Sequence, residues 1–182
     1  KSAIFEIANR LLPKITRKDE RLVKIIENIK LLEKQGYQFE DSQASLELLV
    51  AKNLEIYQNF VEIIDTKVIV EKDISIAVVK VKIQDRERLS SAEGNGPFDA
   101  VNKALRKAIG KINENLINIE LIDYKVRAIE SSAGSDSKVI VNIQTKNKDK
   151  TWDTVGVSTD IVEASMQALI DSIEYAKFMK MI

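Results

Sequence analysis

The chain has 182 residues, enough for one compact domain with additions or for two small domains. Apolar residues make up 45% and charged residues 31%, with 28 basic side chains balancing 28 acidic ones. This balance is typical of a globular protein and gives no net field that attracts nucleic acid or an anionic membrane, so neither is an expected partner. The sequence contains no apolar run of membrane-spanning length and no signal-peptide pattern, which predicts a cytoplasmic protein.

The chain contains neither histidine nor cysteine. It therefore lacks thiolate chemistry and the side chain that most often performs acid–base catalysis near neutral pH or holds catalytic zinc. Carboxylates, lysines and tyrosines remain, so catalysis is disfavoured without being excluded. We predict no catalytic residue, no metal site and no cofactor in this chain. The start at Lys1, directly before a helical pattern, suggests a piece of a longer protein or a processed chain.

Residues 1–55 are predicted to form an all-helical linker subdomain. Apolar residues recur at helical spacing before Pro13 and again between Asp19 and Gly36, which are predicted to start and stop the second helix. Asp41 is predicted to cap a third helix. Short helices with one apolar face bury little surface alone, so these helices need a neighbour to pack against.

From residue 56 onward the apolar pattern changes to the alternation that is typical of strands. Strands are predicted over 61–71 and 74–83, with a bulge at Val78-Val79 where the alternation changes phase. A charged stretch from Asp85 then leads to the turn Gly94-Asn95-Gly96-Pro97. The helix after this turn is predicted to bury Phe98, Val101, Leu105, Ala108 and Ile112.

The same order then repeats. Strands are predicted over 119–129, from Val139, and over 152–157, and the last helix is capped by Ser158 or Asp160. A shift of 64 residues matches Ala100 to Ala164, Ala104 to Ala168, Leu105 to Leu169, and Ile109 to Ile173. The repeated order indicates an internal duplication. We predict an α+β fold in which two βββα repeats form one domain over 56–182, preceded by the helical subdomain over 1–55.

Two segments are candidates for ligand binding. The two glycines of Gly94-Asn95-Gly96-Pro97 permit positive φ, and the helix that follows directs free N–H groups at any nearby anion. From these residues alone, a strand-to-helix turn that binds nothing is the simpler interpretation. The hydroxyl-rich loop over 131–137 either covers a small polar ligand or merely connects two strands. Tyr124 and Trp152 are interpreted as packing residues.

Three segments of the chain, which follow one another in the same order as in the family, resemble one family. Residues 36–49, beginning Gly36-Tyr37-Gln38-Phe39-Glu40, resemble the inter-domain helical segment of citramalate synthases. Residues 156–165 resemble the last turn and helix of the regulatory domain in the isopropylmalate synthase superfamily, and Gly94-Asn95-Gly96-Pro97 resembles its glycine turn. The resemblance spans nearly the whole chain. It points to the C-terminal regulatory and dimerisation domain of the citramalate, 2-isopropylmalate and homocitrate synthase family.

That resemblance implies the function of a larger enzyme. In the family, a metal-dependent TIM barrel joins acetyl-CoA to a 2-oxo acid, and the C-terminal domain dimerises and binds the end product as a feedback inhibitor. The resemblance therefore implies a homodimer, an amino-acid effector and an N-terminal catalytic barrel that this sequence lacks. The divalent metal and acetyl-CoA would belong to that barrel, so the chain itself would not be an enzyme. The helices over 1–53 would relay effector binding to the barrel.

The resemblance also implies an effector pocket between the two repeats, near the dimer interface. Its residues come from the glycine turn, from the second repeat's first strand and loop, and from the partner subunit's turn before the last helix: Gly94, Asn95, Gly96, Pro97, Phe98, Leu121, Tyr124, Ala128, Gly134, Ser137, and then Val157, Ser158 and Thr159. Strict alternation places Leu121 and Tyr124 on opposite faces unless the strand is bulged or Leu121 reaches across the interface. The ligand's carboxylate would lie at the helix N-terminus, and Asp136 or backbone carbonyls would meet its ammonium.

Three alternatives stay open. Isoleucine is the favoured effector because the segment at Tyr37 resembles citramalate synthase, and leucine, in a 2-isopropylmalate synthase, is the close alternative. Discrimination between them depends on the position of one methyl group, worth about 1–3 kcal/mol. The third alternative is a dimerisation scaffold that binds no ligand.

Overall fold

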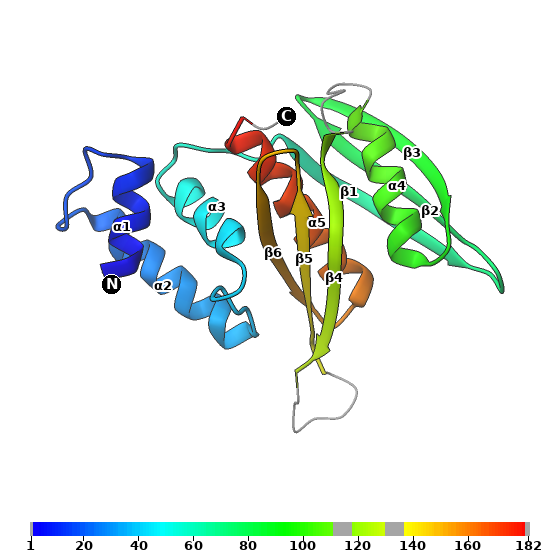
Figure 1. The fold of residues 1–182 in the computed structure, drawn as a ribbon, viewed down its shortest axis with the longest axis horizontal. Coiled ribbons are helices and arrows are strands. Elements are labelled where there is room, and N and C mark those ends of the chain that lie inside the picture. The colour runs from blue at the N-terminus through cyan, green and yellow to red at the C-terminus, as the bar shows by residue number, and fades with distance from the viewer. Residues whose placement is uncertain (1, 111–117, 130–136, 181–182) are drawn as a thin grey trace.

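The computed structural model describes residues 2–110, 118–129 and 137–180. The elements, in chain order, are α1 (Ser2–Leu11), α2 (Glu20–Gln35), α3 (Gln43–Asn53), β1 (Val61–Val70), β2 (Ser75–Ile83), β3 (Arg86–Gly94), α4 (Pro97–Gly110), β4 (Glu120–Ala128), β5 (Val139–Lys146), β6 (Thr151–Ser158) and α5 (Ile161–Phe178). Two antiparallel sheets, ordered β1-β2-β3 and β4-β5-β6, are each followed by a helix. The predicted α+β fold of two βββα units after a helical segment is therefore confirmed (Figure 1).

The predicted ends of the second helix are confirmed. Asp19 caps α2 by accepting a hydrogen bond from the backbone N–H of Arg21 at 3.0 Å. Gly36 ends the helix with φ at 109°, a conformation that glycine adopts without strain. A side chain at Gly36 would also collide with Ile129, whose Cδ1 lies 2.2 Å from the position of a Cβ. The segment between α2 and α3 therefore packs directly on the second sheet.

The predicted cap of the third helix is wrong. The N-cap of α3 is Ser42 rather than Asp41, and the Ser42 side chain makes no capping hydrogen bond. Its hydroxyl instead accepts a hydrogen bond from Asn142 Nδ2 of β5 at 2.9 Å. A contact between distant segments decides where the helix begins, so the local sequence alone misplaces its start by one residue.

The first unit contains a strand that its sequence does not show clearly. The charged stretch after Asp85 is the beginning of β3, which pairs with β2 along its whole length. Gln84 and Asp85 connect the two strands with φ values of 48° and 63°, as in a tight hairpin turn. The strand can carry charged residues at its start because Arg86 and Glu87 are exposed, whereas Ser90 further along is buried.

The predicted bulge at Val78-Val79 is wrong. Burial alternates without interruption along β2, because its second face is also partly apolar and mimics a change of phase. The irregularities lie instead in the first strand of each unit, between Ile63 and Asp65 and between Leu121 and Asp123.

Equivalent pairings support the internal duplication. Val79 of β2 pairs with Ser90 of β3, and Ile143 of β5 pairs with Thr154 of β6 at the same offset of 64 residues. The bulges in β1 and β4 also occupy equivalent positions, because each lies near the start of its unit's first strand. The two units therefore share strand register as well as element order.

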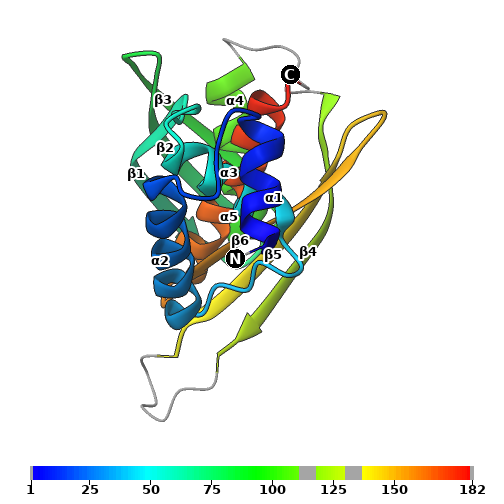
Figure 2. The ribbon, with the colours of Figure 1, turned by 90° about the vertical axis from the view of Figure 1, so that its left-hand side faces the viewer.

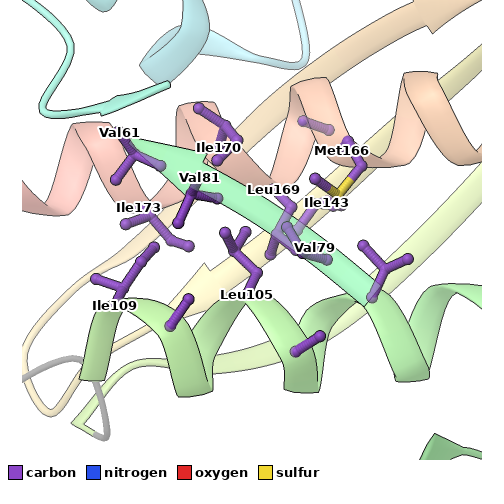
Figure 3. Close-up of a cluster of buried hydrophobic side chains, with 14 of the residues drawn as sticks. Val61, Val79, Val81, Leu105, Ile109, Ile143, Met166, Leu169, Ile170 and Ile173 are labelled. Carbon is purple, nitrogen blue, oxygen red and sulfur yellow. The ribbon is translucent and has the colours of Figure 1, made fainter. Parts of the chain in front are cut away.

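The two units share one hydrophobic core. Figure 3 shows side chains from β2, α4, β5 and α5 pointing toward one another, with Leu105 and Leu169 among them. Leu105 is 0% exposed and Leu169 is 1% exposed. The Leu105 and Leu169 positions are related by the 64-residue shift, so the duplicated helices meet across this core.

A second core joins the helical segment to the second sheet. Ile25 and Leu54 from the N-terminal third pack with Ile140, Val155 and Val157, which lie on the face of that sheet turned away from the shared core. Figures 1 and 2 show α1, α2 and α3 gathered at this side of the molecule. Within the described ranges, no helix combines the length and apolar character needed to cross a bilayer. The domain boundary at residue 55 remains a prediction.

Gly156 is expected to tolerate no side chain. A Cβ at this position would lie 2.0 Å from the carbonyl oxygen of Ala164, because β6 and α5 pack backbone to backbone. We expect Gly156→Ala to lower the free energy of unfolding by about 1–3 kcal/mol, as overpacking does. Gly96→Ala is the matched control, since among the described residues other than its chain neighbours no atom lies within 4 Å of its Cβ position. Urea denaturation compares the two variants, and equal stability would contradict the close approach.

The contribution of the Asp19 cap to the stability of α2 is expected to depend on pH. Hydrogen bonds from the side chain and then the backbone of Arg21 lower the pKa of the Asp19 carboxyl to about 2. Because this pKa is depressed in the folded state, its contribution to stability is present above pH ~4 and is lost as the pH falls toward 2. NMR titration of Asp19 measures the pKa directly. Asp19→Asn, which caps without titrating, should remove this part of the pH dependence, and a normal pKa would contradict the account.

Candidate functional site

The glycine turn connects β3 to α4 without positive φ at either glycine. Gly94 is the last residue of β3, and a Cβ there would lie 2.3 Å from the backbone nitrogen of Ala100. Among the described glycines, only Gly36 has positive φ. Gly94 and Gly96 therefore do not use the positive φ that glycine permits, and close strand-to-helix packing is what requires Gly94. The space around Gly96 is open.

The carboxylate of Asp99 already places a negative charge in the first turn of α4. The Asp99 carboxylate accepts a hydrogen bond from the backbone N–H of Asn95 at 3.0 Å and from the Lys103 ammonium at 2.7 Å. These contacts, that of Lys103 first, hold the pKa of Asp99 below its ordinary value. The helix N-terminus is thus partly neutralised, so a ligand carboxylate would have to share it with Asp99.

Phe98 and Tyr124 form the centre of the site. Their rings stack with centroids 4.1 Å apart and planes inclined by 20°. The Tyr124 hydroxyl lies 2.9 Å from Ser165 Oγ, and that Ser165 hydroxyl donates to the carbonyl of Ile161 at 2.6 Å. Since Ser165 has a single proton to donate, Tyr124 is the donor toward Ser165. The phenol oxygen therefore retains acceptor capacity for a ligand.

A small hollow opens beside this aromatic pair. Its volume is about 240 Å³, and its walls come from the turn before α4, from α4 and β4, and from the first turn of α5: Gly96, Pro97, Phe98, Asp99, Val101, Tyr124, Ile161, Val162 and Ser165. Most of these side chains are apolar. Pockets for drug-sized ligands are larger, at about 300–1,000 Å³, so this hollow suits a smaller molecule.

A second hollow of about 440 Å³ shares Phe98, Asp99 and Tyr124 with the first and is more polar. Leu121 and Tyr124 both line it, because the bulge in β4 places their side chains on the same side of the sheet. This arrangement satisfies the condition under which Leu121 belongs to the site. Arg106 also lines the hollow and donates to Asn102 Oδ1 and to the carbonyl of Ile119. Burial lowers the pKa of Arg106.

Other expected site residues lie elsewhere in the chain. Ala128 is exposed near the far end of β4 and lines neither hollow, and Gly134 lies outside the described residues. Ser137 is half-buried just before β5. Val157 is buried in the second core, between the helical segment and the second sheet, so its side chain does not reach the pocket of its own chain.

Ser158 and Thr159 precede α5, as expected. Ser158 Oγ hydrogen-bonds Glu163 and accepts from the backbone N–H of Asp160. Asp160, one of the two predicted caps, accepts hydrogen bonds from the N–H groups of Val162 and Glu163. The turn is therefore organised by the helix that it starts, and Thr159 is exposed.

The sequence missed the contribution of α5 to the pocket. Ile161, Val162 and Ser165 line the pocket, but a helical pattern in the sequence does not reveal which segment each face of the helix meets. The sequence also missed Asp99, although an acidic residue in a helix's first turn is a signal for an occupied N-terminus.

The family described as the LeuA allosteric (dimerisation) domain matches residues 19–177. The chain is 41% identical to the (R)-citramalate synthase of Geobacter sulfurreducens over 96% of this chain and 34% of that protein. It is 41% identical to the (R)-citramalate synthase of Aquifex aeolicus over 91% of this chain and 32% of that protein. A 2-isopropylmalate synthase of Thermus thermophilus is 42% identical over 53% of this chain and 27% of its own length.

The chain thus spans about a third of the length of the citramalate synthases that it matches. The family match covers the helices from α2 onward and both βββα units, and it agrees with the segments that carried the resemblance. The chain belongs to the LeuA allosteric (dimerisation) domain family.

Proposed function

We propose that this chain is the effector-binding regulatory domain of a citramalate synthase-type acyltransferase and that its ligand is a branched-chain amino acid, with isoleucine favoured. Relatives named (R)-citramalate synthase, which match nearly the whole chain, support the type of parent enzyme. The acetyl-CoA and divalent metal of that enzyme would bind a catalytic barrel outside this chain. Bound isoleucine would inhibit the barrel as the end product of its pathway.

The observation that carries this proposal is the small apolar hollow beside the Phe98–Tyr124 pair. The free energy of a branched aliphatic side chain falls when it leaves water for such an apolar surface. Asp99 on the wall and Arg106 on the adjoining hollow supply opposite charges from one face of α4, which suits the ammonium and carboxylate of an amino acid. The phenol oxygen of Tyr124 is a further acceptor for the ammonium.

A leucine sensor in a 2-isopropylmalate synthase is the second candidate. The match to a protein of that name in Thermus thermophilus favours it, although that match covers 53% of this chain, whereas the two citramalate synthases above match 96% and 91% of it. The third candidate, a scaffold without a ligand, keeps the dimer and lacks any response to amino acids.

A cytoplasmic homodimer is part of the same proposal. The family description as a dimerisation domain supports it. The edge strand β4 also supports it, because Val126 is 38% exposed on the face that carries Tyr124. A second copy packed there would cover apolar surface next to the candidate pocket. It would also bring the turn at Ser158 and Thr159 of the partner subunit toward that pocket.

Thermal unfolding with isoleucine, leucine or valine tests the proposal. A ligand at a hundred times its dissociation constant adds about 2.7 kcal/mol to the free energy of unfolding. We expect isoleucine to raise the unfolding temperature most. A larger shift with leucine would favour the second candidate. No shift with any of the three would contradict ligand binding and favour the scaffold.

A further inference from the structure

Helix α5 touches both the candidate pocket and the helical segment. Its first turn lines the small hollow through Ile161, Val162 and Ser165. Its C-terminal half lies beside α3 (Figure 1). At about 1.5 Å per residue, its 18 residues extend roughly 27 Å, so one rigid element connects two distant parts of the molecule.

The first attachment near the end of α5 is a buried carboxylate. Glu174 is 0% exposed. It accepts hydrogen bonds from the Tyr57 hydroxyl at 2.6 Å, from the backbone N–H of Val61 at 2.9 Å and from that of Phe60 at 3.2 Å. Tyr57 and Phe60 belong to the segment that joins α3 to β1, and Val61 is the first residue of β1. Hydrogen bonds to a buried charge are strong, and removing the acceptor leaves these donors unpaired.

The second attachment reaches α3 and α1. The Tyr175 hydroxyl donates to Glu47 Oε2 at 3.0 Å, and the other oxygen of Glu47 accepts from Arg10 of α1. Glu47 is only 5% exposed. Burial, followed by the Glu47 charge, raises the pKa of Tyr175 to about 12, so the phenol stays protonated and donates at neutral pH.

The same helix is also hydrogen-bonded to the second sheet. The Ser172 hydroxyl forms a hydrogen bond with Thr145 Oγ1 at 2.6 Å and accepts one from Trp152 Nε1 at 3.1 Å. Glu174 and Tyr175 therefore cannot turn independently of the strands behind them. A small displacement of α5 together with these strands would shift both attachments at once, because a packed helix and its sheet move as a unit.

We propose that α5 is the rigid connection through which a ligand in the candidate pocket changes the position of α1 and α3, with Glu174 and Glu47 as its attachment points. This inference rests on the proposed function, since it names the route by which the same site regulates. The ligand shifts the equilibrium only if it binds one position of α5 better than the other. Ile161, Val162 and Ser165 make that difference possible because they touch the pocket directly.

The test uses the full-length enzyme with Glu174→Gln, which removes the charge and replaces one acceptor oxygen by an NH2 donor, and with Tyr175→Phe, which removes the hydrogen bond to Glu47. Both changes leave the side-chain volume nearly the same. We expect the isoleucine dissociation constant to stay within threefold of wild type while the concentration for half-inhibition rises at least tenfold. Glu87→Gln is the matched control, because it makes the same chemical change at an exposed ion pair with Lys80. Half-inhibition that stays unchanged, or that changes in proportion to the dissociation constant, would overturn the proposal.

A second readout separates this inference from the proposed function. In the wild-type chain, we expect slow hydrogen exchange at the amides of Phe60 and Val61, which bond different oxygens of Glu174. In Glu174→Gln, we expect at least tenfold faster exchange at the amide that faces the new NH2 group. Unchanged exchange would overturn the role of Glu174 whatever the ligand. If exchange rises as expected but wild type binds no amino acid, the proposed function fails and the attachment stands. If amino acids bind and both variants remain fully inhibited, the function stands and the relay fails.

Discussion

Leu105→Ala is expected to lower the free energy of unfolding by about 2–5 kcal/mol, the largest stability effect of the predicted changes. Leu105 has no exposed surface and lies where α4 meets both β2 and α5 (Figure 3). Truncation there removes contacts from both βββα units and leaves a cavity that neither helix can close without moving off its own sheet. Urea denaturation at neutral pH measures the effect.

The control for this change is Leu89→Ala, because Leu89 is 70% exposed on β3. We expect it to stay within about 0.5 kcal/mol of wild type. Leu169→Ala, at the duplicated position, should resemble Leu105→Ala, and the double variant should not be additive, because neighbouring core residues couple. A loss no larger than that of the control would contradict a core shared by the two units.

Phe98→Ala is expected to weaken amino-acid binding at least tenfold, which corresponds to about 1.4 kcal/mol. The Phe98 ring forms a wall of the candidate pocket and stacks on Tyr124 at 4.1 Å, so its removal exposes the pocket and frees the Tyr124 side chain. Calorimetric titration with isoleucine measures the change.

Two further variants serve as comparisons for Phe98→Ala. Tyr124→Phe keeps the aromatic stack and loses the hydrogen bond to Ser165, so we expect a smaller loss of affinity. Phe5→Ala removes a ring on α1, far along the chain in the helical core, and should leave affinity unchanged. Equal affinity of Phe98→Ala and wild type would place the ligand elsewhere.

Much of the fold was predictable because local patterns determine it. Asp19 and Gly36 carry the cap and stop signals of α2, and the alternation after residue 56 marks most strands. The start of β3 was hidden, because its inner positions are small or polar, as at Ser90, where an apolar residue would have shown alternation. The bulge was placed in β2 rather than in β1 and β4, since a bulge is defined by the register between two strands.

The candidate site was only partly predictable. The glycine turn, Phe98 and Tyr124 were found by resemblance, and the bulge in β4 explains how Leu121 joins them. The first turn of α5 was missed because only tertiary packing brings Val162 to the hollow. Local sequence likewise could not show that Asp99 already occupies the N-terminus of α4.

An NMR titration of the isotope-labelled chain with isoleucine tests the central claim most directly, because it reports binding and its place together. We expect saturable shifts at the amides of Gly96, Phe98 and Tyr124 and in the first turn of α5, and Phe98→Ala should need at least tenfold more isoleucine to reach the same fraction of these shifts. The absence of saturable shifts, or shifts confined to residues that line neither hollow, would contradict the claim that this pocket senses an amino acid.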